Sequence, residues 1–237
     1  MTQNSVKMFR NTLSKLVGDT FPTLKRRWRR RLRLTPAGWE RFYAETQDPF
    51  GIDGNPYEQG KFEHMMEALD GRRYGHALEV GCSIGSFTEM LAPACDDLLA
   101  IDISQVAVDR TRARLADKPW VKVERRTVPE ELPKGPFDLV VCADVLYYLS
   151  PNELPAAVRR LARSVSSGGT FLALHYLGDG GGLMGGNEVH TLLPQLLDGF
   201  RLVRSERRTG IGPHGSGYQL DRYDRPLDPT EGHSSGD

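Results

Sequence analysis

The chain has 237 residues, with 31 Lys and Arg against 31 Asp and Glu, so its formal net charge is zero. This length suits one α/β domain with a sizeable core and short appendages. The balanced charge gives no general reason to expect a nucleic-acid or membrane partner. No run of ~18 apolar residues predicts a membrane span, and no apolar segment with a cleavage site follows the basic run near the N-terminus, which argues against a secretory signal.

Residues 1–36 are predicted to form a basic N-terminal extension. Seven of the nine residues 25–33 are Lys or Arg, which is typical of a solvated, self-repelling arm. Apolar residues upstream leave peripheral contact with an anionic membrane as an alternative. Nucleic acid is a third reading, which Trp28 alone does not favour, since one aromatic residue is a thin stacking platform. The pattern indicates no oligomeric state.

A helical cap is predicted over residues 37–74. It holds a helix over 38–46, a turn at Asp48-Pro49, and a second helix from about Asn55 to Leu69. The apolar residues of the second helix recur at helical spacing and are interpreted as core. They are Phe62, Met65, Met66 and Leu69.

Residues 75–223 are predicted to form the main domain, an α/β fold in which short apolar strands alternate with helices. Such alternation indicates a mostly parallel sheet with helices on both faces. Strands are expected at about 76–80, 98–101, 120–124, 137–142 and 169–175. Helices are expected near 84–92, 104–116, 152–166 and 188–197. The segments 200–208 and 217–223 alternate as a closing antiparallel pair, and residues 224–237 are predicted to be a disordered tail.

Three cysteines, Cys82, Cys95 and Cys142, lack metal-ligand spacing. An odd count in strand and loop positions indicates reduced thiols. We therefore expect neither a zinc site nor a disulfide, and a cytoplasmic protein.

The stretch from Ala77 to Gly85 is an apolar strand that runs into a small-residue turn opening a helix. Gly81 and Gly85 can adopt positive φ and carry no Cβ, so the turn is expected to leave room for a nucleotide-like ligand. The next apolar run ends at Asp102, where a carboxylate is placed to accept hydrogen bonds from both ribose hydroxyls. An ordinary strand-to-helix turn with a solvated Asp is the alternative reading.

The spacing Gly81-x-Ser83-x-Gly85 lacks the ending that seats a pyrophosphate on a helix N-terminus. Glu79, just ahead of the first glycine, would repel a pyrophosphate but could accept from an amine. S-adenosylmethionine (SAM) has an amine, a ribose and an adenine, and no phosphate. The pattern therefore favours SAM over NAD as the cofactor.

These stretches, together with 137–141 and 168–172, resemble the successive motifs of class I SAM-dependent methyltransferases. Further segments resemble the NodS-like methyltransferases, whose founding members N-methylate deacetylated glucosamine in nodulation-factor chitooligosaccharides. Those segments are 48–51, 57–61, 77–85, 144–149, 175–176 and 188–190. The resemblance covers about 40–223 and implies a Rossmann-like class I fold with a mostly parallel seven-stranded sheet and an antiparallel last strand.

Three departures from that family pattern stand out. Ser83 replaces the usual middle glycine of the first motif, and Asp144 stands where Glu is expected after the fourth strand. The loop 178–186 is a glycine run. We expect this loop to order only when an acceptor binds, bringing His190 toward His175.

Ligands in open parallel sheets lie outside the carboxyl ends of the strands, and this rule selects the donor side of the site. Asp102 is expected to hold the ribose and Glu79 the SAM amine, while Thr127 and Val128 line the adenine. Lys61 and Tyr57 are expected to close over the methionine part, with Lys61 reaching its carboxylate. The other predicted cofactor-binding residues are Gly81, Cys82, Ser83, Gly85, Ile103 and Ala143.

For the acceptor side, His175 is the leading candidate for a general base, because it ends the fifth strand and its ordinary pKa suits neutral pH. A structural hydrogen bond is the competing interpretation. Asp144, Tyr147 and His190 are the other catalytic candidates, although a helix-terminus contact is the stronger reading for His190.

The predicted function is methylation of an amino group on an amino sugar or a related small-molecule or glycan intermediate. Alternatives are an O-methyltransferase of another natural product and an RNA or protein methyltransferase anchored by the arginine-rich arm. The alternative that is not an enzyme is a non-catalytic SAM-binding module. The expected partner is a small-molecule or oligosaccharide acceptor, without a metal.

Overall fold

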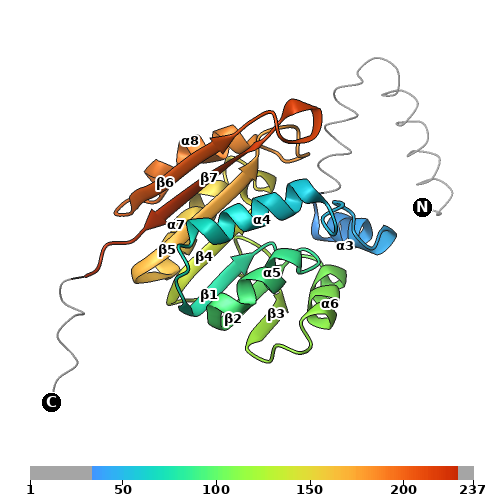
Figure 1. Ribbon diagram of the computed structural model, residues 1–237, viewed down its shortest axis with the longest axis horizontal. Coiled ribbons are helices and arrows are strands. Elements are labelled where there is room, and N and C mark those ends of the chain that lie inside the picture. Colours follow the sequence, from blue (N-terminus) through green and yellow to red (C-terminus); the bar gives the residue numbers. More distant parts are fainter. Residues whose placement is uncertain (1–33, 229–237) are drawn as a thin grey trace, which may run out of the picture.

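The structure of the protein, a computed structural model, describes residues 34–228. A seven-stranded sheet with the order β3-β2-β1-β4-β5-β7-β6 forms its centre (Figure 1). The five parallel strands lie close to the predicted positions, and the last two close the sheet as the expected antiparallel pair. The strands are β1 (Tyr74–Val80), β2 (Cys95–Asp102), β3 (Val121–Arg125), β4 (Phe137–Ala143), β5 (Val165–Tyr176), β6 (Arg201–Arg208) and β7 (Tyr218–Asp224).

Successive strand residues pack on opposite faces of the sheet. Leu78 and Val140 belong to one core cluster, whereas Ala77 and Leu139 belong to the other. A strand buried on both faces gives a near-continuous apolar run, as the sequence shows here. Two helical layers are therefore needed to cover the sheet.

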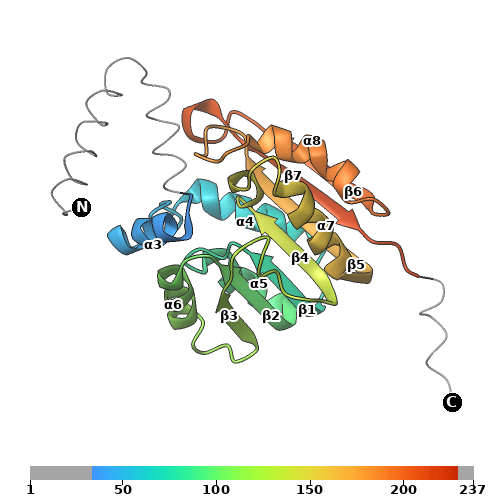
Figure 2. The same cartoon turned by 180° about the vertical axis from the view of Figure 1, so that it is seen from behind.

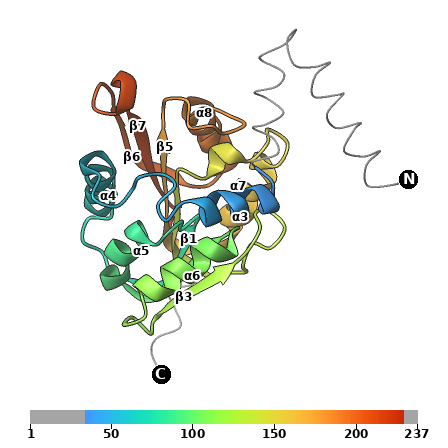
Figure 3. The same ribbon diagram turned by 90° about the vertical axis from the view of Figure 1, so that its right-hand side faces the viewer.

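Helices α4 (Pro56–Ala68) and α5 (Ser86–Leu91) cover one face, while α7 (Leu154–Ser164) and α8 (Gly186–Leu196) cover the other (Figures 2 and 3). Helix α6 (Gln105–Arg114) packs against β3 and β2, and α3 (Pro36–Glu45) lies beside α6. Three 3₁₀ turns complete the set: η1 (Ala92–Ala94), η2 (Leu146–Tyr148) and η3 (Pro213–Gly215).

The starts of these helices follow local capping chemistry. The side chains of Thr35 and Asn55 each accept an N–H from the first turn, and each is followed by a proline at the first helical position. Ser104 caps α6 by accepting from Ala107 N. Capping side chains and an early proline both favour helix initiation.

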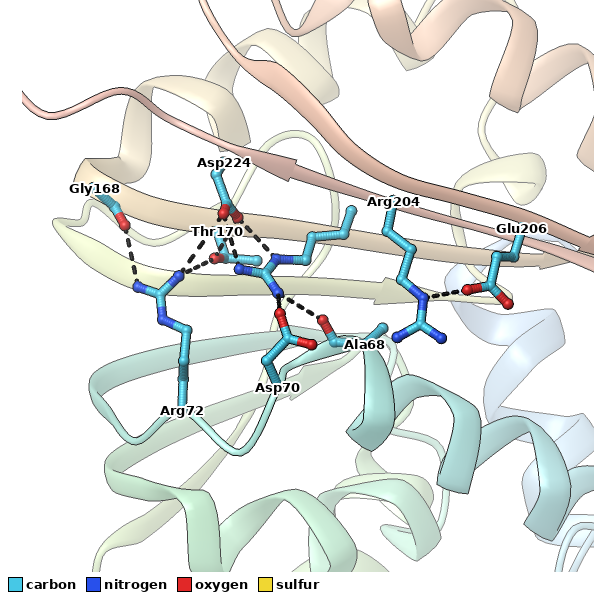
Figure 4. A network of polar contacts seen from close by, with 9 residues as sticks. Ala68, Asp70, Arg72, Gly168, Thr170, Arg204, Glu206 and Asp224 are labelled. Atoms are coloured by element: carbon cyan, nitrogen blue, oxygen red, sulfur yellow. Dashed lines mark hydrogen bonds and ion pairs between the residues drawn. The ribbon is translucent and has the colours of Figure 1, made fainter.

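Helix α4 is tied to the far end of the sheet by a network of ion pairs (Figure 4). Arg222 of β7 is 5% exposed and bonds Ala68 O, Asp70 and Asp224. Arg72 donates to Thr170 and to the carbonyl of Gly168. This network fixes the helix from which Tyr57 and Lys61 reach the opposite end of the sheet.

The ends of the chain differ in part from expectation. Residues 25–33 and 229–237 lie outside the described residues, so the predicted basic arm and most of the tail are not described. Asp224 is the last residue of β7, Arg225 N donates to Gly169 O, and Asp228 N donates to Ser167 Oγ. The prediction of a disordered tail is therefore wrong at Asp224 and Arg225, because Asp224 belongs to a strand and a backbone hydrogen bond holds Arg225.

Within residues 34–228, no helix is long and apolar enough to cross a membrane. All three cysteines are buried and free of disulfides. The same residues contain no group of His, Cys, Asp or Glu that could hold a metal ion.

Candidate functional site

The order of the strands reverses between β1 and β4, which pair in parallel from Ala77 with Leu139 to Val80 with Cys142. The loops after these two strands leave in different directions, so their carboxyl ends open a crevice that side chains of neighbouring loops can line. The predicted motifs after β1, β2 and β4 all meet at this edge.

The turn after β1 has the left-handed backbone that the glycine spacing predicts. Gly81 has φ 80° and Gly85 has φ 84°. A Cβ on Gly81 would lie 2.8 Å from Val145, and one on Gly85 would lie 2.8 Å from Thr111. The expected reason for these glycines needs correction, because they admit the protein's own side chains rather than a ligand.

Ser83 has φ 53° at the central position of the turn. Its N–H donates to Asp102 Oδ2, and its hydroxyl accepts from Tyr43 OH at 3.0 Å. A non-glycine residue in this region costs ~1–2 kcal/mol, and more when it is β-branched. The hydrogen bonds to Asp102 and Tyr43 therefore hold Ser83 in this strained conformation.

Replacing Ser83 by Val is expected to lower the free energy of unfolding by about 1–3 kcal/mol, since a β-branched residue fits the left-handed region poorly. Ser83→Gly is the matched control. We expect it to change by less than about 1 kcal/mol, because relief of strain offsets the lost Tyr43 bond and the greater freedom of unfolded glycine. Urea unfolding of both variants measures this; equal stability would contradict the left-handed assignment.

Asp102 at the end of β2 is 7% exposed. Its Oδ2 accepts from Ser83 N and its Oδ1 from Ser104 N, both at 3.0 Å. Burial raises the pKa of Asp102 to about 6, despite these bonds. Each oxygen retains a second lone pair, which is the capacity that two vicinal hydroxyls would need.

Glu79 in β1 is 3% exposed, and its Oε2 has no hydrogen-bond partner among the described residues. Burial raises the pKa of Glu79 to about 7. Buried carboxylates are normally paired. An unpaired oxygen beside the turn fits a cationic amine of a ligand that the chain alone does not supply.

Helix α3 contributes two polar contacts to this edge that the sequence analysis missed. Glu40 accepts from Ser104 Oγ and from Gln105 N, both at 2.8 Å, and so caps α6. Tyr43 reaches Ser83 as described. The signal available in the sequence was the cluster of aromatic residues Trp39, Phe42 and Tyr43. In the structure the Trp39 ring packs edge-on against Tyr148, with ring centroids 4.8 Å apart.

The remaining donor-side candidates lie around the same turn. Cys82 is 3% exposed and packs with Ala100, Val108 and Val123, so its side chain points into the core and only its backbone borders the crevice. Ile103 packs against the α3 aromatic cluster. The other three candidates are half-buried: Thr127 and Val128 follow β3, and Ala143 ends β4. The N–H of Thr127 donates to Glu131.

Asp144 follows β4 with φ 50°, a strained backbone for a non-glycine residue. Its Oδ1 accepts from Tyr176 N at 2.7 Å and from Tyr147 OH at 3.1 Å. Its Oδ2 accepts from Lys61 Nζ. Strain of this kind is held by surrounding contacts and concentrates at functional sites.

Lys61 lies between two carboxylates of the protein, those of Asp144 and Glu58, the latter at 2.7 Å. Its side chain is 4% exposed, against 27% for Asp144. Burial opposes the charge on Lys61, but the two carboxylates outweigh it and raise the lysine pKa. Burial would also raise the pKa of Asp144, yet Lys61 holds it below its usual range.

The ammonium of Lys61 is shared by two acids, which leaves one of its three N–H donors, so its predicted contact with a cofactor carboxylate stays a prediction. Two carboxylates against one ammonium leave the cluster with a net negative charge. Tyr57, one helical turn earlier, has its ring centroid 5.5 Å from Lys61 Nζ. Its buried hydroxyl has no partner among the described residues, so it remains available to a ligand.

His175 does not face the cleft as expected. Its side chain is fully buried, and its Nε2 accepts from Leu146 N at 3.2 Å. Burial lowers the pKa of His175 to about 3. A buried imidazole with both nitrogens engaged cannot take a proton from an acceptor, so the reason for placing the general base at His175 fails.

His190 and Tyr147 are also buried, at 5% exposure each. His190 reaches across from α8 to His175 and Asp221, so the interpretation as a helix-terminus contact is wrong. Burial, followed by the charge of Asp144, raises the pKa of Tyr147 well above its usual range. Of the four predicted catalytic candidates, Asp144 has the most exposed side chain.

The glycine loop is already seated in this structure. Leu183 N and Met184 N both donate to Tyr147 O, and a Cβ on Gly182 would lie 2.5 Å from that same oxygen. His190 Nε2 is 3.2 Å from His175 Nδ1. The expected dependence of this contact on loop closure is wrong, because the loop has glycines where it passes close to Tyr147.

The strand order, the glycine turn after β1 and the acids ending β1 and β2 define the class as a class I SAM-dependent methyltransferase. The profile of the NodS family, described as Nodulation protein S (NodS), matches residues 41–176, more than half of the chain. The chain belongs to the NodS family.

Nodulation protein S of Rhizobium tropici is 43% identical over 129 residues, which cover 52% of each protein. A ubiquinone biosynthesis O-methyltransferase of Bordetella avium is 34% identical over 120 residues, covering 48% of this chain and 47% of that protein. The chain thus spans about half the length of these curated relatives.

Among solved structures, the chain is similar to the N-methyltransferase NodS from Bradyrhizobium japonicum WM9 in complex with S-adenosyl-L-homocysteine. The TM-score is 0.71 and the identity 26%, covering 80% of this chain and 97% of that one.

Proposed function

We propose that this chain is a SAM-dependent N-methyltransferase whose acceptor is the amine of an amino sugar or a related glycan. The unpaired buried oxygen of Glu79 carries the donor half of the proposal, because a SAM amine would supply the cation it lacks. Asp102 would hold the ribose hydroxyls. Bound SAM would supply an electrophilic methyl group on a sulfonium, so the protein chiefly aligns the acceptor and excludes water.

Asp144 is the residue that we assign to the acceptor. Its carboxylate is 27% exposed and belongs to a cluster with net negative charge, which suits an amine and disfavours an anionic acceptor. Because Lys61 keeps the pKa of Asp144 low, the carboxylate orients one acceptor N–H by accepting its hydrogen bond at the site that Tyr176, Tyr147 and Lys61 leave open. Loss of the amine proton is then to water or through this carboxylate.

A second candidate is O-methylation of another small molecule, favoured by the similarity to the ubiquinone biosynthesis O-methyltransferase. The test is methyl transfer from labelled SAM to deacetylated chitooligosaccharides, other amino sugars, a catechol and RNA. Label on the free amine of the first two supports the proposal. Label confined to catechol oxygen supports the second candidate, and label on RNA overturns both.

The dependence of SAM affinity on pH gives a further prediction. Glu79 binds a cation only when ionised, so its contribution is present above its pKa of about 7 and is lost as pH falls through that value. Between pH 8 and pH 6, we expect this contribution to fall by about tenfold.

Calorimetry on the wild type and Glu79→Gln measures it. The α-amino group of SAM gains its proton over the same pH range, and the variant, with the same ligand, isolates the carboxylate. We expect Glu79→Gln to bind about tenfold more weakly at pH 8 and to match the wild type more closely at pH 6. Parallel pH curves would place the SAM amine elsewhere.

A further inference from the structure

A chain of three buried side chains runs behind the crevice and ends on the turn that carries Asp144. Asp221 Oδ2 of β7 is 2.6 Å from His190 Nδ1, and His190 Nε2 is 3.2 Å from His175 Nδ1. His175 Nε2 is 3.2 Å from Leu146 N, the first residue of η2. Asp221 is 2% exposed and the two histidines 5% and 0%.

The position of each proton in this series of hydrogen bonds follows from the bond that Leu146 N makes to His175. A backbone N–H can only donate, so Nε2 of His175 must be unprotonated. The proton of neutral His175 then lies on Nδ1 and donates to His190 Nε2, which leaves the His190 proton on Nδ1 facing Asp221. In this way a hydrogen bond made by one ring nitrogen sets the tautomer of the other.

This arrangement also fixes the charges. A doubly protonated His190 would donate to His175 Nδ1 and force the proton of His175 onto Nε2, against the N–H of Leu146. Asp221 therefore carries the one charge, supported by Ser205 Oγ at 2.7 Å and Gln219 Nε2 at 3.2 Å. Burial would raise the pKa of Asp221, but its contacts with His190, Ser205 and Gln219 together outweigh burial and lower that pKa.

The turn held by this chain is the one that aims Asp144. Asp144 N donates to Leu174 O at 2.8 Å, and the Leu146 bond is the next link between the turn and β5. Asp144 itself sits at φ 50°, a conformation that persists only when several contacts enforce it.

We propose that Asp221, His190 and His175 are positioning residues that act through Leu146 to hold Asp144 in its acceptor-binding orientation. None of the three touches the acceptor. The proposal rests on the assignment of Asp144 in the proposed function, and its geometric half can be tested without activity.

The first experiment measures the histidine tautomers of the wild-type protein by ¹⁵N NMR, with signals assigned through Asn variants of each histidine. We expect His175 and His190 both to carry their proton on Nδ1. A proton on Nε2 of His175 would overturn the proposal whether or not any acceptor is found.

The second experiment replaces Asp221 by Asn. The amide keeps the shape of the carboxylate but can donate to His190 Nδ1. Donor and acceptor can then be exchanged in each of the following hydrogen bonds, which places a proton on His175 Nε2 and removes the bond from Leu146 N. Ser205→Ala is the matched control, because it removes a bond to the same carboxylate and keeps the charge. We expect Asp221→Asn to move protons to Nε2 and Ser205→Ala to retain the wild-type tautomers.

Activity is measured as methyl transfer to a deacetylated chitooligosaccharide. We expect kcat of Asp221→Asn to fall about 10- to 100-fold, as a small misplacement of an orienting group can cause, with SAM affinity within about threefold. Ser205→Ala is expected to keep kcat within about threefold. Changed tautomers with unchanged kcat would overturn the positioning role, whereas an inactive wild type with the expected tautomers would count against the proposed function alone.

Discussion

Replacing Asp102 by Ala is expected to weaken SAM binding by about 1.5–3 kcal/mol, or roughly 10- to 150-fold, because two ribose hydroxyls would lose a charged acceptor in a largely buried position. The carboxylate is already aligned by the N–H groups of Ser83 and Ser104. The Asp102 carboxylate is therefore already oriented before a ligand binds, and binding does not have to order it.

Calorimetric titration with SAM measures the loss. Asp97→Ala is the matched control, since Asp97 lies near the opposite end of the same strand, with its side chain 37% exposed. We expect Asp97→Ala to bind SAM as the wild type does. Asp102→Ala also leaves two N–H groups without their acceptor, so circular dichroism must confirm folding; a folded variant with unchanged affinity would remove Asp102 from the donor site.

The sequence predicts the sheet well because each strand carries its own signal. A strand buried on both faces must be apolar at consecutive positions, as in β4, where Leu139, Val140 and Val141 are each fully buried. Placement of Glu79 and Asp102 follows as well, because parallel strands bring their carboxyl ends to one edge. The position of these two carboxylates at one edge of the sheet was thus accessible from local pattern and topology, and their role toward a donor stays a prediction.

The acceptor side was not accessible in the same way, because its contacts join residues far apart in the chain. Lys61 and Asp144 are 83 residues apart, and His190 meets its carboxylate partner 31 residues later. Periodicity predicts which face of an element a side chain occupies, but it does not predict which polar group from another element that side chain contacts. In β7, Asp221 and Arg222 are consecutive charged residues in a buried strand, and buried charges require partners.

Replacing Lys61 by Met is expected to lower the free energy of unfolding by about 2–4 kcal/mol at pH 7. Removing one member of a buried ion pair leaves the other charge uncompensated, and here two carboxylates, Asp144 and Glu58, would remain together. Their side chains are 27% and 18% exposed, so partial hydration keeps the loss below that of a fully buried pair. Urea unfolding provides the measurement.

Lys122→Met is the matched control for that experiment. Its side chain is 65% exposed and 3.4 Å from Asp97, and exposed pairs contribute less than about 1 kcal/mol. We expect its stability to stay within that range. A loss as large as that of Lys61→Met would show that removal of any lysine destabilises this fold.

The pH dependence of the Lys61→Met loss separates charge from packing. In the wild type the pKa of Asp144 lies below its ordinary value near 3.8, so its ion pair contributes stability above that value and loses it at lower pH. Without Lys61, burial and Glu58 raise the pKa of Asp144, and the variant gains stability as pH falls and that carboxyl takes up a proton. The difference between wild type and variant should therefore shrink between pH 7 and about pH 4, whereas a difference that is constant with pH would assign the loss to the packing of the lysine stem.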